Sequence, residues 1–209
     1  MEPIKAALLA KRCMDVVGGL LGLLILSPLF LAVSIAIRLT SPGPVFFIQK
    51  RVGQGGKLFT FIKFRSMRVQ HDCSIHREFV KNFIQNNGTC KAGEFKMKDD
   101  PRITPVGRFL RKTSIDELPQ LFNVLKGDMS LVGPRPAIPY EIDEYETWHK
   151  RRVCEVKPGI TGYWQVKGRS STSFENMVRM DIQYISQWSL LWDIIILLQT
   201  PFALFKGAY

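Results

Sequence analysis

The longest apolar stretch of the chain lies close to its N-terminus. Residues 16–37 contain no charged side chain and are bounded by Asp15 and Arg38. A helix of about 20 apolar residues is long enough to cross the hydrocarbon core of a bilayer. This stretch therefore predicts a membrane helix at this end of the chain.

Three interpretations of that helix compete. A cleaved signal peptide has a shorter apolar centre, about 7–15 residues, followed by a small-residue cleavage site. A helix that spans the membrane needs its positive charge on one side, because basic residues mark the cytoplasmic face. Here both ends have basic flanks, made of Lys5, Lys11, Arg12, Arg38, Lys50, Arg51, Lys57, Lys63, Arg65 and Arg68. That distribution favours a helix whose two ends stay on one face of the membrane.

Ser27 and Pro28 lie at the middle of the stretch and indicate how such a helix would turn back. Proline removes a backbone donor and clashes with the preceding turn, so a bend is expected. The Ser27 hydroxyl would help to satisfy the carbonyl groups that the break leaves free. We therefore expect a re-entrant, broken membrane helix, with a kinked helix that still spans the membrane as the alternative.

Turn residues at Ser41-Pro42-Gly43-Pro44 end this segment. We accordingly divide the chain into a membrane-anchoring segment with basic flanks, residues 1–44, and a second domain, residues 45–209. The sequence thus predicts one membrane anchor followed by one domain.

The pattern beyond residue 44 is mixed α/β. Val45–Lys50 and Lys57–Phe64 predict two short strands, joined as a hairpin by the glycine-rich turn at residues 53–56. That turn does not match a phosphate-binding loop, because no G-x-x-x-x-G-K-[ST] pattern is present. Residues 70–98 are polar and predict a variable surface excursion with one short helix near Ile75–Gln85. Further helices are expected around Glu117–Lys126, Tyr140–Val156, Met177–Gln187 and Leu190–Phe205.

The net charge is +11, from 29 basic and 18 acidic residues, which indicates an anionic partner. Most of the excess lies in residues 1–69, around the apolar stretch, so it favours a membrane surface over nucleic acid. The four cysteines show no C-x-x-C spacing. We interpret them as reduced thiols in a cytosolic compartment and expect no zinc site.

Asp116 and Glu117 form the most informative pair in the chain. They follow Ser114 and precede Pro119, which is comfortable only in the first turn of a helix. Ser114 and Glu117 have the spacing of a capping box, which is the purely structural interpretation. The functional alternative is that one carboxylate attacks phosphorus while its neighbour holds Mg²⁺.

Three basic segments favour the functional alternative. Arg111 and Lys112 lie just upstream of the carboxylate pair, and a rigid Gly133-Pro134-Arg135-Pro136 turn presents a guanidinium. A third glycine-bounded segment ends in Arg169. Arginine side chains clamp phosphates through paired hydrogen bonds, so together these segments predict a phosphate site.

Several motifs occur in a recognisable order along the chain. They are Lys11-Arg12 and Asp15 before the Ser27-Pro28 break, residues 61–67, residues 114–130, residues 133–136, residues 158–162, Gln165-Val166, Gly168-Arg169 and Asp181. This set resembles the bacterial sugar transferase family, the small monotopic phosphoglycosyl transferases that begin lipid-linked polysaccharide and glycan assembly. The resemblance covers nearly all of residues 10–205 except the excursion.

The resemblance implies an enzyme of the bacterial cytoplasmic (inner) membrane, with its catalytic domain on the cytoplasmic face. It would transfer a sugar 1-phosphate from a UDP-sugar to polyprenyl phosphate (undecaprenyl phosphate) and release UMP, as a first membrane step of exopolysaccharide biosynthesis. The implied fold is a re-entrant helix joined to a small α/β catalytic domain with interfacial amphipathic helices. Larger family members carry extra membrane helices before this domain, and we expect none within residues 1–10. A homo-oligomer is left open.

The resemblance also assigns roles to residues of this chain. Asp116 would be the nucleophile that forms a phosphosugar–aspartyl intermediate, and Glu117 would bind Mg²⁺. The remaining site residues would hold the donor: Arg111, Arg135, Arg169 and Lys63 at its phosphates, and Asp181 at its nucleotide or sugar.

Two other functions compete with this one. An ordinary glycosyltransferase would release UDP, but many of those hold a metal with a D-x-D motif, and no pair of aspartates here has that spacing. A non-catalytic membrane scaffold of polysaccharide machinery would need neither Asp116 nor Arg169. The nucleotide that is released separates the first of these functions from sugar-phosphate transfer.

Overall fold

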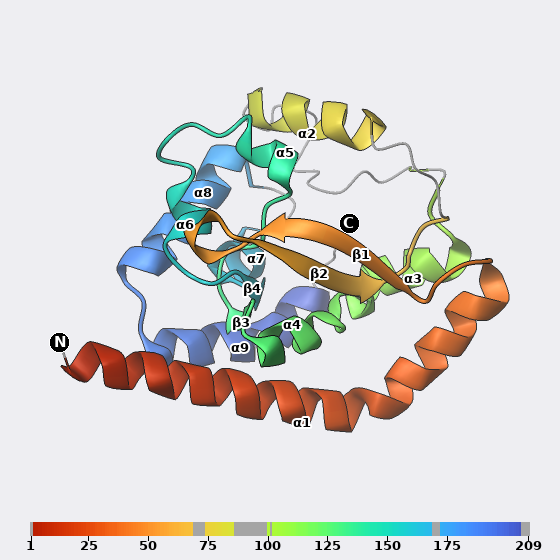
Figure 1. Ribbon diagram of the computed structural model, residues 1–209, viewed down its shortest axis with the longest axis horizontal. Coiled ribbons are helices and arrows are strands. Elements are labelled where there is room, and N and C mark those ends of the chain that lie inside the picture. Colours follow the sequence, from red (N-terminus) through yellow and green to blue (C-terminus); the bar gives the residue numbers. More distant parts are fainter. Residues whose placement is uncertain (1, 69–73, 86–99, 101, 169–171, 206–209) are drawn as a thin grey trace.

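The chain begins with one long helix, α1 (Glu2–Thr40), which runs along one side of the molecule (Figure 1). The computed structural model describes residues 2–68, 74–85, 100, 102–168 and 172–205. After α1 come β1 (Phe46–Val52), η1 (Gln54–Gly56), β2 (Leu58–Phe64), α2 (Ser74–Gln85), α3 (Pro105–Thr113), η2 (Ile115–Glu117), α4 (Gln120–Lys126), β3 (Ser130–Val132), α5 (Pro139–Ile142), α6 (Arg151–Cys154), β4 (Gly159–Thr161), α7 (Tyr163–Lys167), α8 (Phe174–Ser186) and α9 (Leu190–Phe205). We call the elements from β1 onwards the α/β part.

The mixed α/β architecture agrees with the sequence prediction. The hairpin is confirmed: β1 and β2 are antiparallel, from Phe46 opposite Phe64 to Val52 opposite Leu58. A second sheet was not predicted; it pairs β3 with β4 in parallel, and each strand has only three residues. The helices expected at the C-terminal end are confirmed as α8 and α9.

The helix predicted over Tyr140–Val156 is wrong. The structure has two short helices there, α5 and α6, separated by turns. The His149 ring accepts a hydrogen bond at Nδ1 from the backbone N–H of Glu146, 3.1 Å away. It also packs edge-on against Phe174 of α8. His149 is thus fixed by a local side-chain bond and by packing against α8, at a point between the two short helices where a continuous helix was expected.

The predicted surface excursion, residues 70–98, lies mostly outside the described residues. Its one described element is α2, which matches the short helix expected there. Val80 and Phe83 of α2 are buried, and the Phe83 ring centroid lies 6.1 Å from that of Phe174. The helix within the excursion is therefore packed on the core of the α/β part.

Helix α1 is bent, and Pro28 lies inside it (Figure 1). Proline has no N–H to offer the carbonyl four residues earlier, which belongs to Leu24. The Ser27 hydroxyl donates a hydrogen bond to that carbonyl at 2.8 Å. The predicted use of Ser27 at the break is confirmed, because its hydroxyl replaces the donor that Pro28 removes.

Both halves of α1 contact the α/β part. In the first half, Gly19 lies against α4 so closely that a β-carbon there would be 2.9 Å from Leu125 Cδ2. In the second half, Val33 and Ile37 pack with Phe64 of β2 and Leu110 of α3. By length and composition α1 is able to cross a membrane. However, it lies along the α/β part over both halves and does not project away from it.

Buried polar contacts hold the N-terminal half of α1 in place. Arg12 donates to the carbonyls of Val124 and Leu125, 2.7 and 2.8 Å away, at the C-terminus of α4. Asp15 is 2% exposed and accepts from the Ser130 hydroxyl and the Leu131 N–H, each at 2.9 Å. Arg12, one of the basic flanking residues that the sequence suggested would face a membrane surface, is bound to the protein instead.

Lys11 ends in a buried network with α8 and α9. Its ammonium lies 2.6 Å from Asp193 Oδ2, and Asp193 is fully buried. Tyr184 and the Trp188 indole N–H donate to the same carboxylate at 2.6 and 3.0 Å. The only acidic group inside the apolar α9 is therefore neutralised by α1.

At the other end of α1, Arg65 fixes the chain where it leaves the helix. Its guanidinium donates to the carbonyls of Ser41, at 2.7 Å, and of Pro42. Arg65 follows directly after β2 and is buried. Both ends of α1 are thus hydrogen-bonded to the α/β part.

We expect Asp193→Asn to destabilise the fold, because it leaves the Lys11 ammonium without its counter-charge. Removing one partner of a buried ion pair costs about 3–5 kcal/mol. Glu155→Gln is the matched control, since the Arg151–Glu155 pair is exposed and its loss should leave the stability nearly unchanged. Thermal unfolding in detergent would compare the two variants, and equal shifts would show that the Asp193 network does not hold α1.

Candidate functional site

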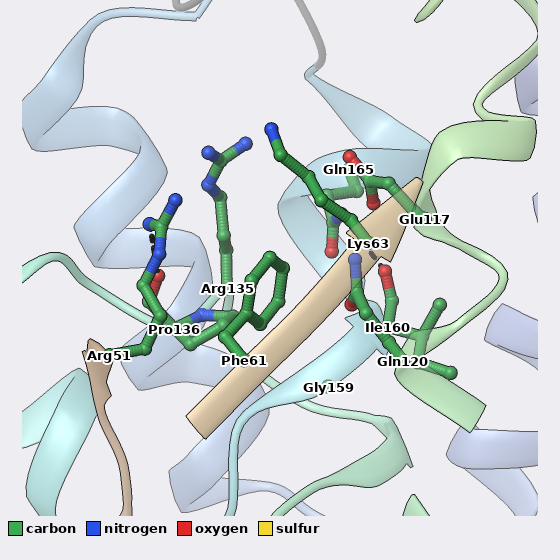
Figure 2. Close-up of a pocket in the computed structure, with 10 residues that line it drawn as sticks. All are labelled: Arg51, Phe61, Lys63, Glu117, Gln120, Arg135, Pro136, Gly159, Ile160 and Gln165. Atoms are coloured by element: carbon green, nitrogen blue, oxygen red, sulfur yellow. Dashed lines mark hydrogen bonds between the residues drawn. The ribbon is translucent and has the colours of Figure 1, made fainter. Parts of the chain in front are cut away.

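A cationic pocket opens between the β1–β2 hairpin, η2 and the β3–β4 sheet (Figure 2). Its empty volume is about 340 Å³, including space open to solvent. It is lined by Arg51, Phe61, Lys63, Glu117, Gln120, Arg135, Pro136, Gly159, Ile160 and Gln165. Three of these side chains are basic, so the pocket suits an anionic ligand.

The hairpin supplies one wall of the pocket. Successive side chains of a strand point to opposite faces, and cross-strand partners share a face. Phe61 and Lys63 are two residues apart on β2, so they share a face. Gln49 of β1 is paired with Phe61, and Arg51 is two residues from Gln49, so Arg51 lies on that same face. The Arg51 guanidinium lies 5.0 Å from the Phe61 ring centroid and donates to the Pro136 carbonyl at 3.0 Å.

The carboxylate pair reaches the site through an abrupt turn. Ser114 has φ 56°, a left-handed conformation, and ends α3. Asp116 and Glu117 then lie on the 3₁₀ turn η2, just before α4 begins at Gln120. The Ser114 side chain makes no capping hydrogen bond, so the capping-box interpretation is wrong. The helix expected to start at Glu117 starts three residues later.

Asp116 does not line the pocket, but its charge acts on Lys63, which does. It is 3% exposed, and its charge raises the pKa of Lys63. Glu117 lines the pocket itself. The two neighbouring carboxylates therefore differ in environment: one is buried and the other faces the hollow.

Burial and like charges lower the pKa of Lys63 to about 8. Desolvation is the largest cause, and the positive charges of Arg51, Arg111 and Arg135 act in the same direction. Lys63 is therefore repelled by three nearby guanidinium groups, although the charge of Asp116 acts in the opposite direction. An anion bound in the pocket would relieve that repulsion.

Arg135 is presented by a rigid loop, as the sequence predicted. The Gly133 N–H donates to the Thr161 carbonyl at 2.9 Å, and the Gly159 N–H donates to the Pro134 carbonyl at 2.8 Å. A β-carbon at Gly159 would lie 2.0 Å from Gly133 N. Only glycine allows the two segments to approach so closely, and this contact sets the position of Arg135.

The structure brings together most of the predicted site residues but not all. Three of them line the pocket directly: Lys63, Glu117 and Arg135. Arg111 and Asp116 do not line it, but their charges act on Lys63. Arg169 lies outside the described residues. Ser27 and Pro28 lie in α1 and do not line the pocket.

Asp181 has a different environment from the other predicted site residues. It lies on α8, is 1% exposed and pairs with Arg152 of α6 at 2.8 Å. Burial raises its pKa to about 6, while the Arg152 charge acts against that rise. At neutral pH the pair is ionised, and its carboxylate joins α6 to α8 outside the pocket lining.

Sequence reasoning missed Arg51, Gln120 and Gln165 as lining residues. Arg51 was counted only among the basic flanks, although strand alternation places it on the face that carries Lys63. That alternation was the signal that would have identified it. Gln120 and Gln165 come from α4 and α7, which approach each other only in the folded chain.

The carboxylate pair fits Mg²⁺ better than a metal that needs a complete protein cage. The described residues contain no group of three or more His, Cys, Asp or Glu side chains that could hold a metal. Mg²⁺ is usually held by one or two carboxylates, with substrate phosphates and water completing its shell. Glu117 facing a cationic pocket meets that requirement when a phosphorylated ligand is present.

The structure thus combines a mixed α/β fold, one long apolar helix and a cationic pocket beside adjacent carboxylates, a combination that suits an anionic, phosphorylated ligand. The family model described as "Bacterial sugar transferase" matches residues 6–207. The chain belongs to this bacterial sugar transferase family, and the resemblance found in its motifs is confirmed.

Several relatives are similar over almost the whole chain. "Galactosyl transferase CpsE" of Streptococcus agalactiae is 48% identical over 194 residues, 92% of this chain and 41% of that protein. "Undecaprenyl-phosphate galactose phosphotransferase" of Salmonella typhimurium is 43% identical over 211 residues, 95% of this chain and 41% of that protein. "Exopolysaccharide production protein ExoY" of Sinorhizobium fredii is 38% identical over 203 residues, 96% of this chain and 88% of that protein. The chain therefore spans about two fifths of the first two relatives and most of the third.

We expect the affinity of the pocket for UDP to fall as the pH rises through about 8, because Lys63 loses its proton there. Lys63→Arg should shift this fall to higher pH, since a guanidinium stays protonated throughout. Titration calorimetry across the pKa of Lys63 would compare the two proteins. Identical pH profiles would show that Lys63 is not the titrating group.

Proposed function

We propose that this chain transfers a sugar 1-phosphate from a UDP-sugar to polyprenyl phosphate and releases UMP. The observation that carries the proposal is the Asp116–Glu117 pair beside the cationic pocket, within a part of the chain that rests on α1. The relatives named as an undecaprenyl-phosphate galactose phosphotransferase and a UDP-glucose:undecaprenyl-phosphate glucose-1-phosphate transferase support it.

The reaction would proceed in two displacements at one phosphorus atom. In the first, an Asp116 carboxylate oxygen attacks the phosphorus that bears the sugar, and the bond to the UMP oxygen breaks. In the second, a phosphate oxygen of polyprenyl phosphate attacks the same phosphorus, and the bond to Asp116 breaks. The carboxylate is regenerated, and the product is a polyprenyl diphosphate sugar.

The environment of Asp116 suits this role. Asp116 is a buried carboxylate close enough to Lys63 for its charge to raise the pKa of that residue, so an ammonium compensates for part of the loss of hydration of the carboxylate. Lys63, Arg111 and Arg135 would hold the phosphate oxygens and stabilise the negative charge that builds up as the donor bond breaks. Arg169 would add a further cation from the segment after α7.

Glu117 would hold Mg²⁺ against the diphosphate of the donor. When bound, the metal would neutralise phosphate charge and favour departure of UMP. Glu117 lines the pocket rather than lying under it, so its carboxylate is accessible to such an ion. With Glu117 at the metal, the role of nucleophile would belong to Asp116.

We further propose that α1 enters the membrane and returns to the same face as the catalytic pocket. Lys11 and Arg12 bind one end of α1 to the α/β part, and Arg65 binds the other. If α1 crossed the bilayer, one of these ends would have to separate from its partners. Since UDP-sugars are cytosolic, the shared face would be the cytoplasmic one.

Helix α9 would lie at the membrane interface beside α1 (Figure 1). Leu191, Leu198 and Phe202 on α9 are 66–72% exposed, and Leu24 and Ile25 on α1 are 72% and 71% exposed. The apolar helices would bury these side chains among lipid tails and keep the pocket at headgroup depth. A lipid-anchored acceptor would then reach the pocket without leaving the bilayer.

We expect Asp116→Asn to abolish the release of UMP from UDP-sugars, because an amide keeps the shape of the side chain but cannot act as this nucleophile. The assay mixes purified protein, Mg²⁺ and polyprenyl phosphate with a panel of UDP-sugars and separates UMP from UDP. Lys112→Gln is the control, since this neighbouring basic residue is exposed and lies outside the pocket.

The product identifies the function. UMP that depends on Asp116 supports sugar-phosphate transfer and names the sugar. UDP would establish a direct glycosyl transfer, and no nucleotide release across the panel would favour a non-catalytic scaffold. Full activity in Asp116→Asn would rule out the covalent intermediate.

Cysteine labelling in sealed membrane vesicles tests the re-entrant topology. Cys13, which is exposed, reports on one end of α1, and Pro42→Cys reports on the other, each in a background without other cysteines. We expect a membrane-impermeant maleimide to label both from the side on which it labels Cys154, the marker for the α/β part. Labelling of the two ends from opposite sides would establish a spanning helix.

A further inference from the structure

One face of the β1–β2 hairpin continues beyond the cationic pocket. The cross-strand pairs on this face are Arg51 with Phe59, Gln49 with Phe61, and Phe47 with Lys63. Three of these six side chains line the pocket: Arg51, Phe61 and Lys63. Phe47 does not line the pocket but is the next side chain of the same row. The face that carries the pocket cations Arg51 and Lys63 therefore also carries the aromatic ring of Phe47.

Phe47 is exposed, unlike the pocket residues of the same row. Its exposed fraction is 39%, against 6% for Phe61 and 4% for Arg51. The Lys63 ammonium lies 5.1 Å from the centre of the Phe47 ring. Lys63, a cation of the pocket, is thus a direct neighbour of the exposed apolar ring of Phe47.

This end of the hairpin also adjoins the proposed membrane segment. Phe46, next to Phe47, stacks on Phe64 with ring centroids 5.5 Å apart. Phe64 packs in turn against Val33 and Ile37 of α1. The end of the hairpin that carries Phe47 therefore lies beside α1, with Phe46 and Phe64 on the face toward α1 and Phe47 and Lys63 on the opposite face, which holds the pocket.

We propose that Phe47 and Lys63 form the acceptor end of the site: Lys63 binds the phosphate of polyprenyl phosphate, and Phe47 packs on its first isoprene units. This inference rests on the proposed function. An acceptor lipid carries an anionic head directly bonded to an apolar chain, so its binding site needs a cation and an apolar surface side by side. Lys63 and Phe47 provide that combination, at the end of the pocket that adjoins α1.

The sugar donor has no apolar chain, so its phosphates would contact Lys63 and the buried part of the row before the acceptor binds, without any need for the Phe47 ring. Uracil is the one flat group of the donor that could stack on an exposed phenyl ring. The acceptor assignment therefore predicts that loss of the Phe47 ring weakens binding of polyprenyl phosphate and leaves binding of UDP unchanged.

The test measures equilibrium binding of polyprenyl phosphate in mixed detergent micelles, without donor, for the full chain and for three variants. Phe47→Ala should weaken this binding by about tenfold, which corresponds to about 1.4 kcal/mol. Phe47→Leu should retain most of the affinity, because it keeps an apolar surface. Ile48→Ala is the matched control: it lies on the same strand, is 63% exposed and faces the other side of the hairpin.

Binding of UDP is measured for the same proteins, together with exchange of labelled UMP into UDP-sugar in the absence of acceptor. Weaker UDP binding in Phe47→Ala would assign the ring to uracil and overturn the proposal. Unchanged lipid binding in Phe47→Ala, or an equal loss in Ile48→Ala, would also overturn it. Failure of wild-type protein to exchange UMP would instead refute the covalent mechanism, while lipid binding still decides the role of Phe47.

Discussion

The contact between α1 and the α/β part is maintained by buried charge at one end and by apolar packing at the other. Lys11, Arg12 and Asp15 bind carbonyl, hydroxyl and carboxylate groups of four different elements. A charged side chain taken out of water needs such partners, because an uncompensated buried charge is costly. These partners exist only when the α/β part is folded, so the position of the apolar helix and the fold of the site depend on each other.

The contact with α1 also fixes where the pocket lies relative to this helix. The hairpin carries Lys63 and Phe61 into the pocket, and its next residue, Phe64, packs against α1. The carboxylate pair on η2 follows α3, which contacts the same half of α1. A single rigid arrangement thus holds the anchor, the cations and the carboxylates, which suits a reaction between a water-soluble donor and a lipid acceptor.

The pocket itself is electrostatically unfavourable in the absence of a ligand. Burial is the main cause that lowers the pKa of Lys63 to about 8 and that of Arg51 to about 10, and the charges of neighbouring guanidinium groups, Arg135 among them, act in the same direction. Proteins tolerate such repulsion mainly at functional sites, where a bound ligand relieves it. The surrounding contacts, such as the Gly133–Thr161 and Gly159–Pro134 hydrogen bonds, keep the cations together.

The sequence by itself determined the apolar helix with its proline break, the hairpin and the carboxylate pair, because each of these is a local pattern. It also identified the family, since ordered motifs need no knowledge of contacts. Only the tertiary structure decided that α3 ends in the left-handed Ser114, that three-residue strands pair as β3 and β4, and that Tyr140–Val156 folds back. It also decided that Lys11 and Arg12 bind protein, that Asp181 pairs with Arg152, and that Arg51 joins the pocket. The physical reason is that the partner of a charged side chain comes from whichever distant segment covers it, and a local pattern carries no information about that segment.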